Sequence, residues 1–252
     1  MPFLTAYYTE KGYMKQVNQD ALMIQTAKSS KGSVGMFVVC DGMGGLNKGE
    51  VASSTIIEAL SYWFKHLLPF LLDSAEVEEL PLYLVEKIES INQDLIESSA
   101  DKQMGSTLTA IIMVDNQYFT FQIGDSRAYA LGQEVTRLTK DQSLVAREVE
   151  RGMITEQQAM THPQRHVLLQ CIGVESDIEV VTTSGVLSEG EQILLCTDGF
   201  YRSLTTEEIH QVIAQDTLVD KGNMEESLNA LVQTIKSREE TDDITAILVQ
   251  TV

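Results

Sequence analysis

Aspartates from distant parts of the chain stand where short apolar, strand-like runs begin or end. They are Asp20, Asp41, Asp125, Asp198, Asp242 and Asp243. Some of them adjoin a glycine, and a single Asp-Gly pair is ordinary turn chemistry. As a set they suggest more, because the strand ends of a sandwich lie on a common edge where these side chains could converge.

Such a cluster of carboxylates has a predictable chemistry. Carboxylates close together repel one another and resist ionisation unless a cation neutralises them. No His or Cys stands at these positions, and an all-oxygen set suits magnesium, manganese or calcium rather than zinc or copper. The helix-loop-helix pattern of calcium sites is absent. Two divalent ions that share a carboxylate can activate a bridging water and neutralise phosphoryl oxygens, so the pattern favours hydrolysis.

Other short motifs do not meet the requirements of their chemistry. The loop Gly42-Met43-Gly44-Gly45 has Asn47 where a dinucleotide fingerprint needs a third glycine. Gly124-Asp125-Ser126-Arg127-Ala128 ends in Ala where a serine-hydrolase elbow has glycine. His162 and His166 are four residues apart, but a proline lies between them and no Glu follows the first. They are poor candidates for metal ligands.

Composition narrows the classes of partner and the compartment. The chain has 252 residues and a formal net charge of −19, which argues against nucleic acid or an anionic membrane surface as a partner. Its cysteines, Cys40, Cys171 and Cys196, are odd in number and are interpreted as free thiols in a reducing compartment. The N-terminus does not resemble a signal peptide, and the most apolar stretch, Leu60–Leu72, is too short to span a bilayer. We expect a cytoplasmic protein.

Hydrophobic spacing predicts alternating blocks of strands and helices. The predicted strands are Ala21–Thr26, Met36–Cys40, Thr107–Val114, Tyr118–Ile123, Arg127–Leu131, Gln192–Thr197 and Ile244–Thr251. The predicted helices are Glu50–Leu72, Leu82–Ser98, Ser143–Arg151, Glu156–Thr161, Thr206–Ala214 and Met224–Lys236. Pro69 should end or kink the first helix, and Thr205 with Glu208 resembles a capping box. This order predicts one mixed domain built on antiparallel sheets, with a helical flap inserted at about 142–173.

Taken together, these segments resemble the metal-dependent protein phosphatases of type 2C, in their bacterial branch. The matching motifs are Asn18-Gln19-Asp20, Val39-Cys40-Asp41-Gly42-Met43-Gly44-Gly45, Gly105-Ser106-Thr107, Gly124-Asp125-Ser126-Arg127, Leu138-Thr139 with Asp141, Leu195-Cys196-Thr197-Asp198-Gly199 and Thr241-Asp242-Asp243-Ile244-Thr245. The resemblance implies an α+β fold over residues 1–252, an α/β/β/α sandwich of two mostly antiparallel sheets flanked by helices.

The resemblance also implies an activity and roles for particular residues. The enzyme would hydrolyse phosphoserine and phosphothreonine in proteins by direct attack of a bridging metal-bound water, opposing a serine/threonine kinase in bacterial signalling. Two Mn²⁺ or Mg²⁺ ions would occupy the core site, and Asp125 together with Asp198 would suit a third, weaker ion. Asp41 would bridge the two ions, and the other implied metal-site residues are Asp20, Gly42, Asp125, Asp198 and Asp242. The partners would be phosphorylated proteins and the kinase, and the chain would act as a monomer without nucleic acid or membrane.

Some positions depart from the family pattern. Lys15 stands where the family has a phosphate-gripping arginine, and it is counted among the catalytic residues with Asp41, although it could be a solvated surface lysine. Asp243 replaces the usual asparagine, which leaves open whether it also binds metal. Gln170 replaces an arginine of the flap. Met43 stands where eukaryotic members have histidine, so another group would protonate the leaving oxygen.

Alternative functions remain open at this point. A catalytically weak relative could act as a phosphoprotein-binding module, and Lys15 and Asp243 are the departures that favour it. An unrelated two-metal hydrolase could act on small phosphate esters. Turnover of phosphopeptides compared with nucleotides would separate that class from a protein phosphatase.

Overall fold

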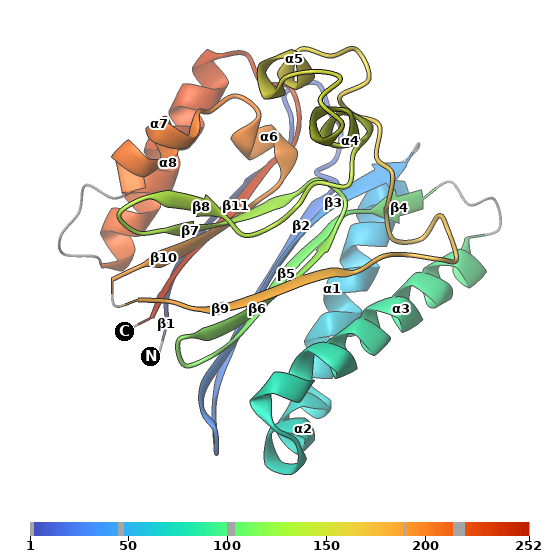
Figure 1. The fold of residues 1–252 in the computed structure, drawn as a ribbon, viewed down its shortest axis with the longest axis vertical. Coiled ribbons are helices and arrows are strands. Elements are labelled where there is room, and N and C mark those ends of the chain that lie inside the picture. The colour runs from blue at the N-terminus through green and yellow to red at the C-terminus, as the bar shows by residue number, and fades with distance from the viewer. Residues whose placement is uncertain (1–2, 45–47, 100–103, 189, 214–219, 252) are drawn as a thin grey trace.

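The chain folds as two antiparallel sheets packed face to face, with helices on both outer faces (Figure 1). The computed structural model describes all residues except 1–2, 45–47, 100–103, 189, 214–219 and 252. One sheet has the strand order β1-β11-β10-β7-β8, and the other has the order β2-β3-β5-β6-β9 with β4 paired to the end of β3. Every pairing is antiparallel.

The strands of the first sheet come from both ends of the chain and its middle. They are β1 (Phe3–Glu10), β7 (Arg127–Leu131), β8 (Val135–Arg137), β10 (Gln192–Cys196) and β11 (Ile244–Thr251). The strands of the second sheet are β2 (Asp20–Ser29), β3 (Gly32–Gly44), β4 (Met104–Ser106), β5 (Leu108–Val114), β6 (Gln117–Ile123) and β9 (Val181–Val186). Both sheets therefore draw strands from the two halves of the sequence.

The helices divide between the two outer faces (Figure 1). The second sheet is covered by α1 (Lys48–His66), α2 (Leu68–Ser74) and α3 (Leu80–Ser98), with the short 3₁₀ helix η1 (Val77–Glu79) before α3. The first sheet is covered by α6 (Asp198–Tyr201), α7 (Thr206–Ile213) and α8 (Lys221–Ser237). No described helix is long and apolar enough to cross a membrane.

The central strands are apolar on both faces because each sheet is covered twice. In β3, Val38 and Cys40 pack against the helices, whereas Phe37 and Val39 point the other way, into the layer between the sheets. This alternation follows from the two-residue period of a strand. Burial on both faces turns the usual alternation of polar and apolar residues into a continuous apolar run.

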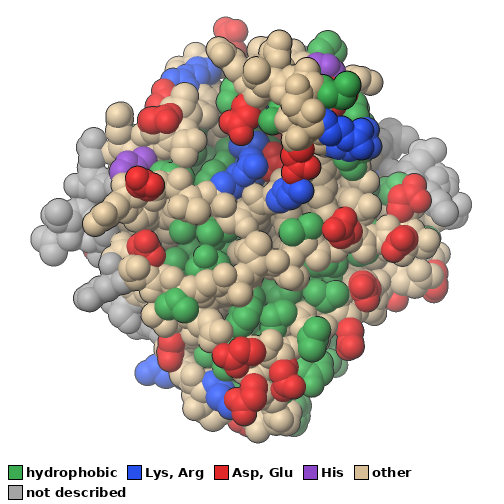
Figure 2. All heavy atoms as spheres, viewed as in Figure 1, with side chains coloured by type: hydrophobic (Ala, Val, Ile, Leu, Met, Phe, Trp, Pro, Cys, Tyr) green, Lys and Arg blue, Asp and Glu red, His purple; other side chains and the backbone are tan. Residues whose placement is uncertain are grey.

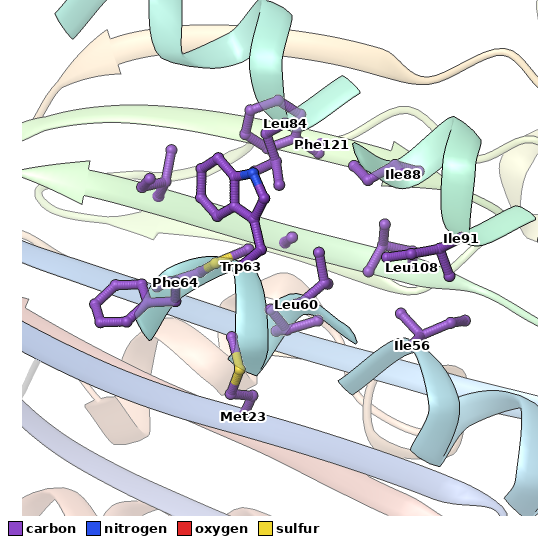
Figure 3. Close-up of a cluster of buried hydrophobic side chains, with 14 of the residues drawn as sticks. Met23, Ile56, Leu60, Trp63, Phe64, Leu84, Ile88, Ile91, Leu108 and Phe121 are labelled. Atoms are coloured by element: carbon purple, nitrogen blue, oxygen red, sulfur yellow. The ribbon is translucent and has the colours of Figure 1, made fainter. Parts of the chain in front are cut away.

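The core under α1 and α3 is a dense cluster of large side chains (Figure 3). Trp63 and Leu60 of α1 meet Leu84 and Ile88 of α3 above Phe121 of the sheet, and all are nearly or fully buried. Burial of each large side chain stabilises the fold by roughly 1.5–3 kcal/mol. This layer packs against β3, and β3 carries Asp41 and Gly42 of the candidate site.

Most of the predicted elements are confirmed, and their ends match to within a few residues. Strands β7 and β11 have the predicted bounds. The predicted helix Glu50–Leu72 is broken after His66, and a new helix, α2, begins at Leu68 with Pro69 in its first turn. Thr205 and Glu208 form the predicted reciprocal cap at α7. The predicted end of that helix at Ala214 lies outside the described residues.

The sequence patterns missed β1, β4, β8, β9 and α6. Strand β9 is a sheet edge whose residues are mostly exposed, so it lacks an apolar run. The strands β4 and β8 have three residues each, and α6 has four. Such short elements exist only because their neighbours pair or pack with them, and this dependence is invisible to local periodicity.

The flap at 142–173 carries two short helices, α4 (Leu144–Glu150) and α5 (Glu156–Met160), which lie near α6 at the end of the sandwich (Figure 1). Its base is closed by two backbone hydrogen bonds, from Leu144 N to Val167 O and from Leu169 N to Gln142 O, each 2.8 Å. Ser143, the first residue of the predicted helix, is the N-cap of α4, because its side chain accepts from Ala146 N. The flap is thus an ordered insertion with a narrow stem.

Candidate metal and catalytic site

The predicted aspartates meet at one end of the sandwich because the register places them there. Asp20 and Asp41 are directly opposed across β2 and β3. Asp198 and Asp242 come from the neighbouring strands β10 and β11 of the other sheet, just beyond their paired ends. The hydroxyl of Thr197 donates to Asp20 Oδ2 at 2.8 Å and so joins the two sheets at this edge.

The glycines beside these aspartates serve close backbone approach. A Cβ at Gly42 would lie 2.1 Å from the carbonyl oxygen of Gly49, at the start of α1. A Cβ at Gly199 would lie 2.1 Å from the carbonyl oxygen of Asp243. Neither glycine has a positive φ. The turn interpretation is therefore wrong for these two Asp-Gly pairs: only glycine lets the backbones that carry the aspartates pack this closely.

The acidic side chains raise one another's pKa. Burial, followed by the charges of Asp198, Asp20, Asp242 and Asp125, raises the pKa of Asp41 well above its ordinary value. Burial raises the pKa of Asp20 to about 8, although the hydroxyls of Thr245 and Thr197 oppose the shift. Burial and the loss of hydration disfavour the charged form, and neighbouring negative charges add to that effect.

Two carboxylate oxygens of the cluster lack any partner within the described part of the chain. They are Oδ1 of Asp20 and Oδ1 of Asp198, and both are buried. An unpaired buried oxygen is costly, and an unpaired buried charge more so. All the candidate metal-ligand atoms here are oxygens, which matches Mn²⁺ or Mg²⁺. These residues fit a hard divalent cation in charge and in kind.

Some of the expected ligands are held by cations of the chain itself. Lys15 Nζ donates to Asp242 Oδ1, and Arg202 Nη2 lies 2.6 Å from Asp198 Oδ2. As they stand, no three His, Cys, Asp or Glu side chains of the described residues are placed to hold an ion together. Asp242 would have to turn away from Lys15 to become a ligand.

Lys15 lies at the site rather than in solvent, on the loop between β1 and β2. Burial would lower its pKa, but the hydrogen bonds and charges of Asp242 and Asp243 outweigh that effect and raise it. Burial would likewise raise the pKa of Asp242, and the contact with Lys15 instead lowers it. The interpretation of Lys15 as a solvated surface residue is therefore wrong, since its ammonium group is half-buried among carboxylates.

Asp243 anchors the loop that carries Lys15. Its side chain is 1% exposed, and Oδ1 accepts from Gly12 N at 2.8 Å. Oδ2 accepts from Gln19 N and from Lys15 Nζ, each at 2.9 Å. Both oxygens thus have partners from residues 12–19, so the acceptor capacity of Asp243 is used by the loop.

A second acidic pair lies on the outer side of the cluster. Burial and the charge of Asp198 raise the pKa of Asp125 to about 7, against the charge of Arg202. Burial raises the pKa of Asp198 to about 6, again against Arg202. Arg202, at the end of α6, contacts both carboxylates and also His166 of the flap. Sequence reasoning missed Arg202, whose one signal was its position a helical turn after Asp198.

The remaining candidates take other roles. His162 accepts from Gln164 N, whereas His166 contacts Arg202, so the two histidines do not share a ligand. Gln170 accepts from Glu179 N and so braces the segment after the flap. Asp141 forms a bidentate pair with Arg127, whose guanidinium stacks on Tyr201 at 3.8 Å. Asp141 is thus paired with Arg127.

Comparison with known proteins agrees with this geometry. Residues 10–248 match the family model of protein phosphatase 2C. The serine/threonine phosphatase stp of Listeria innocua is 32% identical, over 97% of this chain and 94% of its own length. The structure of the Streptococcus agalactiae serine/threonine phosphatase has a TM-score of 0.85 and 28% identity, covering 99% of this chain and 100% of its own. The catalytic domain of the serine threonine protein phosphatase PstP, solved with two manganese ions, has a TM-score of 0.80 and 27% identity, covering 99% of this chain and 98% of that chain.

The two-sheet sandwich, the cluster of aspartates at its end and these comparisons together define the chain as a phosphatase. The chain belongs to the protein phosphatase 2C family, as a bacterial-type serine/threonine phosphatase. The expected fold class is confirmed: two antiparallel sheets are flanked by helices on both sides. The activity is that of a protein serine/threonine phosphatase, a phosphoric monoester hydrolase.

Proposed function

We propose that this phosphatase depends on two Mn²⁺ or Mg²⁺ ions and hydrolyses phosphoserine and phosphothreonine by direct attack of water, with no phospho-enzyme intermediate. The observation that carries the proposal is the convergence of carboxylates from both sheets, with the Oδ1 atoms of Asp20 and Asp198 buried and unpaired. The two manganese ions bound to PstP, a structural neighbour, support it further.

The residues that would hold the ions are the ones implied by the resemblance to the family. Asp41, in the middle of the cluster, would contact both ions, and the carbonyl of Gly42 would bind the first. Asp198 and Asp242 would bind the second, and Asp20 would hold a water. When bound, the ions would lower the pKa of a water between them and neutralise the phosphoryl oxygens of the substrate.

Lys15 would bind the phosphate. In this structure its ammonium group neutralises Asp242 and Asp243. With Asp242 bound to an ion, Lys15 would keep Asp243 as its anchor and would have donors left for a phosphoryl oxygen. A lysine supplies charge without the bidentate fork of arginine, so phosphate would be bound less tightly than by an arginine at this position.

The wider proposal concerns partners and place. The substrates would be phosphorylated proteins, and a cognate serine/threonine kinase would produce them. We extend the proposal to a cytoplasmic monomer without nucleic-acid or membrane partners, because the net charge of −19 repels polyanions. Figure 2 shows acidic side chains spread over much of one face. The three free cysteines, two of them buried, are compatible with a reducing compartment.

The test is hydrolysis of a phosphothreonine peptide by the pure protein, with Mn²⁺, with a chelator, and with Asp41→Asn as the control. We expect turnover that requires Mn²⁺ and is lost in the variant. A nucleotide substrate run in parallel tests the small-ester alternative, which predicts the reverse preference. Absence of turnover in a folded, Mn²⁺-loaded sample would overturn the proposal in favour of a phosphoprotein-binding module.

A further inference from the structure

Within the described part of the chain, Arg202 is the one cationic side chain that contacts both Asp125 and Asp198. Its Nη2 lies 2.6 Å from Asp198 Oδ2 and 3.4 Å from Asp125 Oδ2. The side chain is 17% exposed, and the two carboxylates are 8% and 6% exposed. A guanidinium is charged at all working pH values and presents its donors in a fixed plane, which suits two acceptors at once.

The two oxygens of Asp198 face different partners. Oδ2 accepts from Arg202, whereas Oδ1 is buried and has no partner among the described residues. The free oxygen is therefore available to an ion of the inner cluster, beside Asp41. The oxygen that an outer ion would need is already occupied by Arg202.

The outer side of Arg202 is closed by the flap. Its Nη1 lies 2.7 Å from His166 Nδ1. Because a guanidinium has no acceptor, this ring nitrogen must accept the hydrogen bond. On the other side, Tyr201 donates its hydroxyl to the backbone carbonyl of Asp125 at 2.9 Å and so fixes the distance between α6 and the carboxylate. Arg202 is thus enclosed by acceptors from three parts of the fold.

We propose that Arg202 is a built-in cation that takes the place of a third metal ion between Asp125 and Asp198, so that this chain binds two ions and not three. The inference rests on the proposed two-metal site and specifies its size. The Asp125 and Asp198 pair was expected to suit a third, weaker ion; here Arg202 neutralises that pair and repels a divalent cation. Arg127 cannot do the same, because Asp141 and Tyr201 hold its guanidinium.

The test counts bound Mn²⁺ in the purified full chain. The electron paramagnetic resonance signal of free aqueous Mn²⁺ measures the unbound ion during a titration, and metal analysis after equilibrium dialysis checks the result. The variants are Arg202→Asn and Arg202→Gln, which remove the charge, and Arg202→Lys, which retains it. Arg147→Asn is the matched control, since Arg147 is an exposed arginine on α4. Circular dichroism confirms that each variant is folded.

We expect two ions in the unchanged chain, in Arg202→Lys and in Arg147→Asn. Both neutral variants should gain a further ion at Asp125 and Asp198, because the opposing charge is gone. A third ion already present in the unchanged chain would overturn the inference, as would folded neutral variants that still bind two. No binding at all in the unchanged chain is a different result, and it would contradict the proposed two-metal site itself.

Discussion

One strand, β3, passes through two regions of opposite character, an apolar core layer and a cluster of carboxylates. Its first part packs Val38 and Cys40 beneath α1, in a layer where every large side chain has apolar neighbours. A single residue further on, Asp41 enters a group of mutually repelling carboxylates. The first region is complete as folded, whereas the second has buried oxygens that find no partner in the described part of the chain.

This contrast teaches where stability and function reside. The apolar layer under α1 and α3 supplies free energy of folding and nothing else. The acidic edge costs free energy in the metal-free chain, because carboxylates are brought together and desolvated. A fold tolerates such a site only when other regions compensate, and the cost is what creates affinity for cations.

The largest effect should come from Asp41→Asn. This substitution changes the acidic cluster and leaves the apolar layer intact, so it should lower activity without lowering stability. We expect kcat/KM to fall by more than about a thousandfold, since one lost electrostatic contact commonly costs up to that much and Asp41 would touch both ions. In the metal-free state, the variant should melt at the same temperature as the unchanged chain or higher, because one repelling charge is removed. Assays with Mn²⁺ and thermal melts in chelator measure the two quantities. A variant that is less stable and still active would contradict the comparison.

In the apolar layer we expect the reverse, a loss of stability without a loss of activity. Helix α3 offers two leucines for a matched comparison. Leu84 is fully buried and Leu82 is 67% exposed on the same helix. Leu84→Ala should lower the free energy of unfolding by about 2–5 kcal/mol, and Leu82→Ala should change it by less than about 0.5 kcal/mol. Activity per folded molecule should hold in both. Urea unfolding with parallel assays measures this, and equal effects of the two substitutions would refute the assigned burial.

The stabilising effect of Mn²⁺ should grow with pH. Burial raises the pKa of Asp20 to about 8, and burial together with Asp198 raises the pKa of Asp125 to about 7, whereas an unfolded aspartate has a pKa of about 3.9. Between these values the folded chain holds more protons than the unfolded chain, so metal-free stability falls as pH rises through this range.

At about pH 8, each Mn²⁺ ion bound at a hundred times its Kd should stabilise the fold by about 2.7 kcal/mol, or roughly 5–10 °C in Tm for a chain of this size. At about pH 5 the shift should be much smaller, because protons occupy the carboxylates. Thermal melts with Mn²⁺ and with chelator at both pH values measure the difference. A shift that is equal at both values, or larger at the lower one, would count against a carboxylate metal site.

The smallest effect concerns Lys15, which links the acidic edge to the substrate. Lys15→Ala should raise KM by roughly tenfold, the loss expected for one charged hydrogen bond to phosphate. Lys15→Arg should lower KM, because a guanidinium grips phosphate with two donors. Steady-state kinetics on a phosphothreonine peptide measure both. An unchanged KM in Lys15→Ala would show that the lysine only balances Asp242 and Asp243.

Much of the fold was predictable from local patterns in the sequence. Strand β11 follows from a short apolar run, and the cap formed by Thr205 and Glu208 follows from helix-end chemistry. Both signals act within a few residues. The candidate metal ligands were also predictable in kind, because Asp41 and Asp198 stand at the ends of apolar runs. The edge strand β9 was not predictable, since its mostly exposed residues pair with β6 without forming a buried face of their own.

What the sequence by itself determined is therefore the set of elements and the acidic residues that their ends would carry. Only the tertiary structure decided which cation meets which carboxylate: Lys15 on Asp242 and Asp243, and Arg202 across Asp125 and Asp198. It also showed that Gly42 and Gly199 serve close packing rather than turns. Periodicity and capping are local, whereas charge pairing depends on distances between loops of two different sheets, which exist only once those sheets have packed.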